Sequence, residues 1–189
     1  MDVYIEELID VLQSTEFNKG ATSYSYEDGI KLLVDIFTKH KKSGSKVYFI
    51  GNGGSAAIAS HMTADFMKNG GMNTVSLYDN AVTTCMGNDY GFEDVFSKPL
   101  SFLVSEGDLL VAISSSGKSQ NILNSIDVAK SKGLNTISFT GFDSDNPVRS
   151  SSDAGVYIPS HKYGIVESIH NLILQEIVDL IMERDGVSL

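Results

Sequence analysis

Cysteine, positive charge and long apolar runs are all scarce in this sequence of 189 residues. Cys85 is the one cysteine, which excludes an intrachain disulfide and a multi-cysteine metal site and fits a reducing compartment. The 14 lysines and arginines face 24 acidic residues, and a net charge of -10 without a basic block argues against nucleic-acid binding. The N-terminus is acidic and no apolar run approaches ~20 residues, which argues against a signal peptide and a membrane span. We therefore expect a cytoplasmic protein.

The chain has no linker, repeat or low-complexity tract, so we expect residues 1–189 to form a single domain. Apolar residues at helical spacing predict two amphipathic helices, at 3–13 and 26–42, before the first strand. Residues 1–44 are expected in an oligomer interface, with simple packing on the same domain as the alternative. His40, near the end of the second helix, is expected at the surface.

A glycine turn joins an apolar strand, 47–50, to an alanine-rich helix. Gly51, Gly53 and Gly54 allow a ligand to approach the backbone closely, and Ser55 is predicted as the N-cap. Free amides of the first helical turn and the Ser55 hydroxyl predict an anion site, with phosphate as the expected ligand. The alternative is an ordinary α/β turn, since the stretch lacks the Lys-Ser/Thr of a P-loop and the GxGxxG spacing.

Two pairs of polar residues are candidate functional groups. His61 and Asp65 lie four residues apart on one face of the helix after the glycine turn. That spacing suits a shared proton path or a shared metal ion, and a solvated pair is the alternative. Asn88 and Asp89 lie in a segment, 79–104, predicted as irregular or short helical structure. They are turn formers that suit hydroxyl binding, and an ordinary loop is the alternative.

A second and more specific anion cradle follows the clearest strand, 107–113, whose continuous apolar run is typical of a buried parallel sheet. Ser114-Ser-Ser-Gly-Lys-Ser119 comes next, and an amphipathic helix follows it. Hydroxyls and amides at a strand-to-helix junction favour phosphate contact, whereas serine-rich linkers do not lie between a buried strand and an amphipathic helix. Two such turns predict a crevice at the carboxyl ends of two parallel strands, where ligands of open α/β sheets bind.

The order of elements predicts an α/β fold with about five parallel strands and helices on both faces. The remaining strands are predicted at 74–77, 135–139 and 155–158, with a short turn at Pro147 before the last. A long helix at 163–184 ends the chain. On it, the residues predicted in the core are Ile169, Leu172, Ile173, Leu174, Ile177, Leu180 and Ile181, and those predicted outside it are Glu167, His170, Gln175 and Asp179.

Four motifs resemble the sugar isomerase (SIS) domain, in particular the phosphoheptose isomerases: Gly51-Asn-Gly-Gly-Ser-Ala-Ala, Gly87-Asn-Asp-Tyr-Gly-Phe, Ile113-Ser-Ser-Ser-Gly-Lys-Ser and Glu167-Ser-Ile-His. The resemblance covers nearly the whole chain and implies a flavodoxin-like sheet and a homotetramer with active sites at subunit interfaces. It also implies conversion of sedoheptulose 7-phosphate to D-glycero-D-manno-heptose 7-phosphate, a precursor of surface heptose. The phosphate and sugar contacts that it implies fall on Asn52, Gly53, Gly54, Asn88, Asp89, Ser114, Ser115, Ser116 and Ser119.

The resemblance further implies a zinc site and a catalytic set, which this sequence matches in part. His61 matches the first ligand, Asp65 stands where the family has a glutamate, and Glu167 and Gln175 stand where it has a glutamine and a histidine. We expect these four side chains to converge on one site for a divalent ion, since one imidazole and three oxygen donors suit zinc or a harder ion. Asp65 or Glu167 is the expected base, Gln175 completes the catalytic set, and Glu167 is also expected to contact the substrate.

The leading hypothesis is an aldose–ketose isomerase that moves a proton between C1 and C2 of a phosphorylated sugar through a cis-enediol. The alternative is a non-catalytic SIS protein, either a sugar-phosphate sensor or a tetrameric scaffold like the relative that binds the bacterial replication initiator. Loss of the family's glutamate and last histidine favours the alternative. Retention of His61 and of carboxylates near a closed pocket favours the enzyme, because buried carboxylates are costly without a function.

Overall fold

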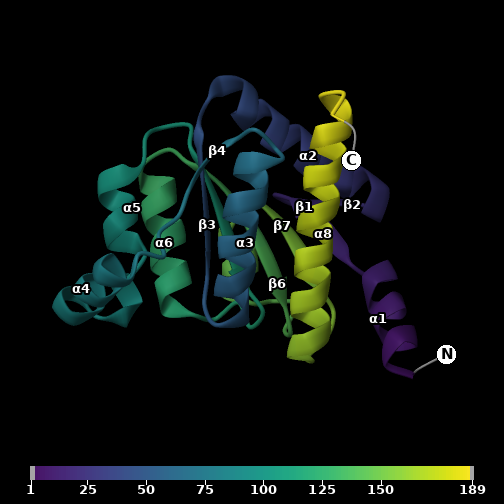
Figure 1. Ribbon diagram of the computed structural model, residues 1–189. Helices are drawn as coiled ribbons and strands as arrows, with labels where there is room; N and C mark the ends of the chain where they lie inside the picture. Colours follow the sequence, from purple (N-terminus) through teal and green to yellow (C-terminus); the bar gives the residue numbers. More distant parts are fainter. Residues whose placement is uncertain (1–2, 188–189) are drawn as a thin grey trace.

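The computed structural model describes residues 3–187, which form one seven-stranded sheet with helices on both faces (Figure 1). Residues 1 and 2 of the predicted N-terminal segment lie outside the described part. The helices are α1 (Val3–Gln13), α2 (Tyr26–Ser43), α3 (Gly54–Lys68), α4 (Asn80–Tyr90), the 3-10 helix η1 (Phe92–Asp94), α5 (Ser97–Leu103), α6 (Gln120–Ser131), α7 (Pro147–Ser151) and α8 (Tyr163–Arg184). The strands are β1 (Glu16–Lys19), β2 (Thr22–Tyr24), β3 (Lys46–Gly51), β4 (Asn73–Val75), β5 (Leu109–Ser114), β6 (Asn135–Gly141) and β7 (Ala154–Ile158).

Five neighbouring strands run parallel, which confirms the predicted parallel sheet. The order across the whole sheet is β2-β1-β7-β6-β5-β3-β4, and β1 pairs antiparallel with both of its neighbours. After β3 the chain moves outward to β4 and then returns to β5 on the other side of β3. The carboxyl ends of β3 and β5 therefore flank the point where the strand order reverses, which is where open α/β sheets bind ligands.

The two faces of the sheet carry separate hydrophobic cores. Val47 and Phe49 of β3 face the core built with α2, α3 and α8, whereas Tyr48 and Ile50 face the core built with α5, α6 and α7. Every residue of β5 is buried, as the continuous apolar run predicted. Fully burying one such large side chain contributes about 1.5–3 kcal/mol, so the sheet is a rigid base for the loops at its edge. On one face α3 and α8 lie side by side (Figure 1).

The β1–β2 hairpin was not predicted from the sequence. Strands of four and three residues are too short to show an alternating pattern. Gly20 makes the turn with φ 55°, a left-handed conformation that glycine adopts without strain. A side chain at Gly29 would overlap Phe17, since a Cβ there would lie 2.2 Å from the Phe17 ring, so glycine lets α2 pack onto β1.

Three predicted placements are wrong. His40 is buried, at 3% exposure, because its ring is satisfied by Ile36 O at Nδ1 (2.8 Å) and by the Asn135 side chain at Nε2 (3.2 Å). His170 is fully buried in the core, and Leu172, predicted there, is 41% exposed. Helical spacing gives the centre of an apolar face, but the partners of a polar side chain decide whether it is buried.

The segment 79–104 is helical, as α4, η1 and α5, rather than irregular. Asp79 caps α4 by accepting a hydrogen bond from Val82 N at 2.9 Å. Asn88 and Asp89 therefore lie in the last turn of a helix and not in a loop. Within residues 3–187, no helix is both long and apolar enough to cross a membrane.

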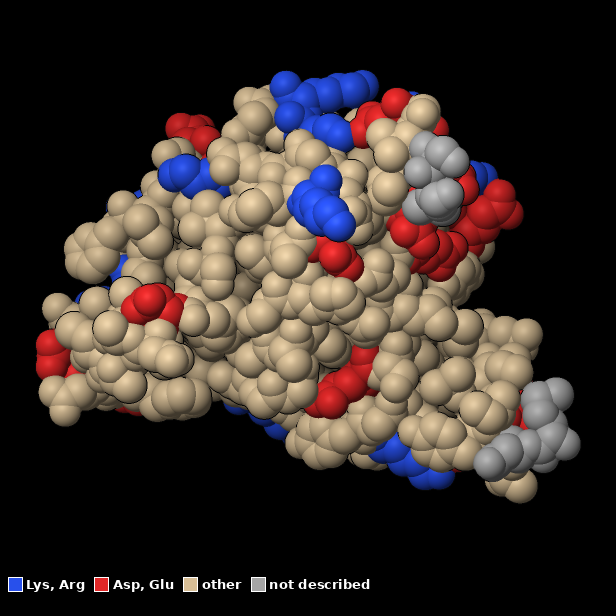
Figure 2. Space-filling view, in the orientation of Figure 1, with Lys and Arg blue, Asp and Glu red and all other residues tan. Residues whose placement is uncertain are grey.

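The face in Figure 2 carries its acidic side chains unevenly. They gather beside the C-terminal half of α8, the segment that carries Glu176, Asp179 and Glu183, and they also show between α3 and α8. Asp65 lies on α3 and Glu167 on α8. This distribution agrees with the net charge of -10.

Candidate functional site

The loop after β5 forms one wall of the site and carries the hydroxyls of Ser114, Ser115, Ser116 and Ser119. It is fixed from outside by the connection after β6, because Gly141 N donates to Ser115 O (2.9 Å) and Val148 N donates to Gly117 O (3.0 Å). Gly117 has φ 62°, and a Cβ there would lie 1.9 Å from the Asn146 side chain, so this position requires glycine. Ser115 Oγ is buried without a hydrogen-bond partner among the described residues. The loop is rigid and has a hydroxyl to offer to a ligand.

The same loop ends at the N-terminus of α6. Ser119 is the N-cap, its carbonyl accepts from Ile122 N and Leu123 N (both 3.1 Å), and its hydroxyl makes no capping bond within the described residues. That hydroxyl remains for a ligand at the positive end of the helix dipole. The predicted second anion cradle thus has the expected geometry of a strand-to-helix junction.

The opposite wall comes from the turn after β3. Gly53, not Ser55, is the N-cap of α3, and its φ of 55° is a conformation that glycine adopts without strain. Ser55 instead lies in the first turn of α3, 4% exposed, and lines the cavity. The predicted capping role of Ser55 is therefore wrong, whereas its place beside the ligand cavity is as expected.

A pair of asparagines ties the two walls together. Asn52 and Asn121 exchange two side-chain hydrogen bonds, each 2.9 Å, between the first turn and α6. Asn121 is buried and was not predicted from the sequence, because its partner lies 69 positions away. The pair fixes the distance between the walls.

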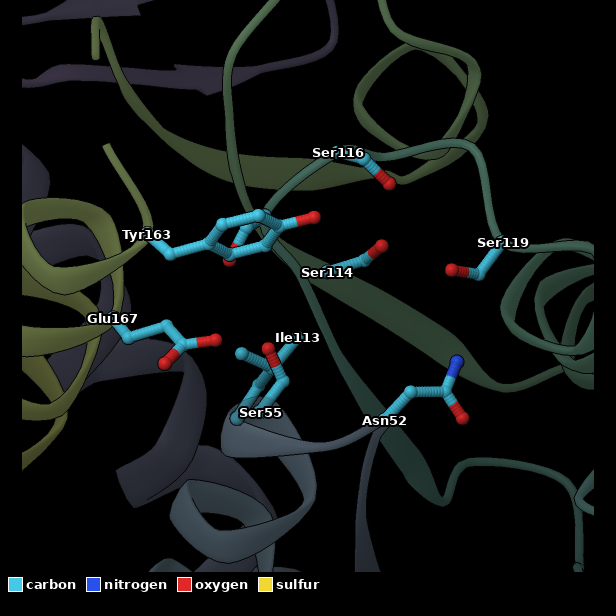
Figure 3. Close-up of a pocket in the computed structure, with 9 residues that line it drawn as sticks. Asn52, Ser55, Ile113, Ser114, Ser116, Ser119, Tyr163 and Glu167 are labelled. Carbon is cyan, nitrogen blue, oxygen red and sulfur yellow. The ribbon is translucent and has the colours of Figure 1, made fainter. Parts of the chain in front are cut away.

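Glu167 brings a carboxylate into the cavity from the second turn of α8. Its side chain lies against Gly54, where a Cβ would be 2.2 Å from Oε2, so glycine makes room for it. Gly54 opens α3, and the positive end of that helix dipole favours a negative charge beside it. Figure 3 shows Glu167 across the cavity from Ser119.

The cavity encloses about 120 Å³. It gathers most of the predicted phosphate and sugar contacts, together with two residues, Ile113 and Tyr163, that the sequence did not suggest. Glu167 is the one carboxylate among the described residues that line it, and none of those residues is a lysine or arginine. The lining consists of Asn52, Ser55, Ile113, Ser114, Ser115, Ser116, Ser119, Tyr163 and Glu167.

His61, Asp65 and Gln175 form a separate cluster further along α3 and α8. Asp65 Oδ2 lies 3.0 Å from His61 Nε2 and accepts a hydrogen bond of 2.6 Å from Gln175 Nε2. Glu167 does not join them: its carboxylate lies against Gly54 in the cavity, and among the described residues it does not gather with His61 and Asp65. The structure thus brings together three of the four residues predicted to converge.

Asn88 and Asp89 do not line the cavity of this chain. Both are exposed on α4, where Asn88 Nδ2 donates to Asp89 Oδ1 at 2.8 Å and the Cys85 thiol lies 3.6 Å from Asp89 Oδ2. All residues of α4 lie within the described part of the chain, and none of them is buried in the single chain. The pair is accessible to another molecule.

The fit of a metal ion depends on Gln175. Within residues 3–187, no three histidine, cysteine or carboxylate side chains gather as a metal-binding group. His61 Nε2 and Asp65 Oδ2 are adjacent nitrogen and oxygen donors, and an amide oxygen from Gln175 would bring the set to three ligands, the number that catalytic zinc sites use. The residues therefore fit a zinc ion if the Gln175 amide turns its oxygen toward it, with Glu167 outside the set.

His170 is fully buried in the core and is neutral at pH 7. Burial lowers the pKa of its imidazole to about 4, against the opposing effect of a hydrogen bond from Nε2 to Thr140 O (3.1 Å). Because Nε2 donates to the carbonyl, Nδ1 is the unprotonated nitrogen, and it has no partner among the described residues. His170 is a core residue beside the ring of Phe139 and not a ligand in the cluster.

Comparisons with known proteins show which family the chain resembles in sequence. The family model of the SIS domain matches residues 13–141. A phosphoheptose isomerase of Sulfurimonas denitrificans is 33% identical over 100% of both chains, and one of Citrifermentans bemidjiense is 32% identical over 88% of this chain and 87% of the relative.

Solved structures give the same result. A phosphoheptose isomerase from Francisella tularensis matches with a TM-score of 0.83 and 27% identity over 95% of each chain. One from Neisseria gonorrhoeae matches with a TM-score of 0.82 and 28% identity over 97% of this chain and 96% of that one. The chain therefore belongs to the SIS-domain proteins and, among them, to the phosphoheptose isomerase family.

Proposed function

We propose that the protein is an aldose–ketose isomerase that converts sedoheptulose 7-phosphate to D-glycero-D-manno-heptose 7-phosphate. The carrying observation is one cavity in which a carboxylate, Glu167, faces a serine loop at a helix N-terminus. Support comes from relatives named phosphoheptose isomerase that are 32–33% identical over most of the chain. Such an isomerase would supply heptose to carbohydrate biosynthesis.

The phosphate binds at the Ser114–Ser119 loop. Neutral hydroxyls and the amides at the start of α6 surround it there, and the dipole of α6 favours its negative charge. Asn52 and Ser55, on the opposite wall, meet the hydroxyls of the sugar. The substrate therefore lies across the gap between the carboxyl ends of β3 and β5.

Glu167 is the base in this proposal. It takes a proton from one of the two carbons, C1 or C2, while the carbonyl oxygen on the other carbon gains a proton, which gives a cis-enediol. It then returns its proton to the other carbon as the oxygen on the first carbon loses its proton and becomes the carbonyl of the isomeric sugar. Asp65, the other candidate, has one oxygen occupied by both His61 and Gln175 and does not line the cavity. Carbon-to-carbon transfer by one carboxylate needs that carboxylate beside the substrate, and Glu167 meets this requirement.

A zinc ion is proposed as the cofactor, one per subunit. His61, Asp65 and the Gln175 amide oxygen would hold it. The ion would supply Lewis-acid stabilisation to a substrate oxygen that extends from the cavity toward this cluster. In the chain itself, Asp65 orients the His61 imidazole from its neighbouring turn and keeps Gln175 turned toward α3. A zinc-binding assay without substrate tests this separately from turnover.

Four copies are proposed to assemble, with the segment 1–44 in the interface. Helix α1 has no buried residue in the single chain, and it exposes Val3, Tyr4, Ile5 and Ile9. Asn88 and Asp89, which are exposed on α4, are proposed to reach the cavity of a neighbouring copy.

The test is an assay of the purified protein with sedoheptulose 7-phosphate, run after treatment with a chelator and again with added zinc. We expect the aldose to form. Its formation can be measured by chromatography or by the exchange of a solvent deuteron into C1 or C2. Binding of the sugar phosphate without turnover under any metal condition would favour a non-catalytic sensor, and neither binding nor turnover would favour a scaffold.

A further inference from the structure

Tyr163 is the large aromatic side chain in a cavity otherwise lined by small polar groups. It is the first residue of α8 and is 61% exposed. In Figure 3 its ring lies along the side of the cavity above Glu167, and its hydroxyl is directed toward Ser114 and Ser116. The phenol is therefore directed toward the hydroxyls of the serine loop, while the side chain as a whole stays exposed.

Phe142 fixes the ring of Tyr163 from behind. The two rings meet edge to face, with centroids 4.8 Å apart at 75°, and the other neighbour of Phe142 is His161, stacked at 5.5 Å. Phe142 has φ 59°, a strained conformation for a residue with a side chain. It is maintained because Phe142 N donates to Ser160 O (3.0 Å) and Tyr157 Oη donates to Phe142 O (2.7 Å).

The support continues back to the serine loop. Asp143 accepts from Lys118 Nζ (2.7 Å) and lies 3.2 Å from His161 Nε2, so it joins the serine loop to the segment before α8. Lys118 also donates its backbone amide to Ser116 Oγ (3.3 Å). A continuous chain of contacts thus joins five residues: Lys118, Asp143, His161, Phe142 and Tyr163. It sets Tyr163 at a fixed place relative to Ser116.

The charges of the side chains that line the cavity indicate a role for Tyr163 in binding phosphate. Among the described residues that line the cavity, none is a lysine or arginine and Glu167 is an acid, so a bound phosphate must be satisfied by neutral donors. A phenol is a hydrogen-bond donor of this kind. We propose that Tyr163 is a substrate contact whose hydroxyl donates to the phosphate beside Ser114 and Ser116. This rests on the proposed function, in which the serine loop holds the phosphate.

The test measures binding by calorimetry with two probes, inorganic phosphate and sedoheptulose 7-phosphate. Tyr163→Phe keeps the ring and its contact with Phe142 but removes the donor, and Tyr24→Phe, on β2 at the edge of the sheet, is the matched control. We expect Tyr163→Phe to weaken the binding of both probes about tenfold, as for loss of one hydrogen bond to a charged group. Tyr24→Phe should bind both like the wild type.

Three results would overturn the inference. Wild-type affinity of Tyr163→Phe for both probes would remove the phosphate contact and leave the proposed isomerase intact. Loss for the sugar phosphate with unchanged affinity for inorganic phosphate would place Tyr163 on the sugar and not on the phosphate. If the wild type binds neither inorganic phosphate nor sedoheptulose 7-phosphate, the proposed function and this inference are both removed.

Phe142 is a positioning residue in this scheme, and a second variant tests it. Phe142→Gly relieves the strained φ, so the protein should keep its fold, while Tyr163 loses the edge contact that fixes it. Phe142→Gly alone should lower the affinity for inorganic phosphate. In the double variant Phe142→Gly with Tyr163→Phe, the affinity should be no lower than in Tyr163→Phe alone. Additive losses in the double variant would contradict positioning through Tyr163.

Discussion

Gln175 donates its side-chain amide to Asp65 Oδ2 across 2.6 Å, and this contact ties the middle of α8 to the end of α3. His61 Nε2 lies 3.0 Å from the same oxygen. At the position where the resemblance implies a histidine, α8 therefore carries Gln175, whose amide contacts the same oxygen of Asp65 as His61 does. The cluster is weaker as a metal site than one with a second imidazole, and it is stable without a metal because its polar atoms satisfy one another.

Gln175→His should tighten zinc binding by at least about tenfold, because an imidazole is a better zinc ligand than an amide. The measurement is competition with a chromogenic chelator in the absence of substrate. Gln13→His, at the end of α1, is the control for an added surface imidazole, and it should not change the affinity. A Gln175→His protein no tighter than the wild type would separate this cluster from metal binding.

Replacing Ser116 and Ser119 together by alanine should weaken affinity for the sugar phosphate by at least about tenfold, since hydrogen bonds to a charged group are lost. The free energy of unfolding should change by no more than about 1 kcal/mol, because Ser116 Oγ accepts one 3.3 Å bond from Lys118 N and the Ser119 hydroxyl makes no capping bond among the described residues. Calorimetry and urea denaturation give the two quantities. Ser14→Ala with Ser131→Ala, both far from the cavity, is the matched control, and equal affinity of the two double variants would remove the phosphate assignment.

Light scattering at micromolar concentration should report about four chains. The apolar side chains of α1 lose contact with water in such an assembly, and Val3 at 76% exposure has the most to lose. Ile5→Glu with Ile9→Glu should shift the protein to smaller species, because a buried interface tolerates unpaired charges poorly. A wild type that is monomeric at this concentration contradicts both the assembly and a cavity shared between copies.

His170 should make the protein less stable in mild acid. The folded pKa of about 4 lies below the ordinary value of 6.5, so the unfolded chain binds the proton first as the pH falls. From pH 7 to pH 5 this costs about 2 kcal/mol of the free energy of unfolding. His170→Gln keeps a donor for Thr140 O but does not titrate. Urea denaturation should therefore show that, between pH 7 and pH 5, the variant loses about 2 kcal/mol less of its free energy of unfolding than the wild type does. Equal losses would mean that His170 is not buried as a neutral group.

Most of the sheet and the long helix could be predicted because their signals are local. Buried parallel strands such as β5 appear as continuous apolar runs, and α8 repeats its apolar residues at the helical period over 22 residues. The β1–β2 hairpin has neither signal. The buried positions of His40 and His170 depend on distant carbonyl and amide partners, which no local pattern contains.

The site was predictable where one loop holds several functional groups, as in Ser114–Ser119, and not where it depends on how two elements align. α3 and α8 run alongside each other so that Glu167 meets Gly54 while Gln175 meets Asp65. Helical spacing indicates which face each residue occupies but not its partner along the neighbouring helix. Tyr163 likewise lines the cavity because Phe142, from a different loop, supports it.

Glu167 is the proposed base of the isomerase. The most direct measurement is turnover of sedoheptulose 7-phosphate by the wild type and by Glu167→Gln, with the affinity of each for the sugar phosphate measured in parallel. The account predicts that Glu167→Gln lowers kcat by at least about a hundredfold while affinity changes by less than about threefold, because a base acts mainly in the transition state. A Glu167→Gln protein with wild-type turnover, particularly beside an inactive Asp65→Asn, would contradict the account and assign the proton transfer to α3.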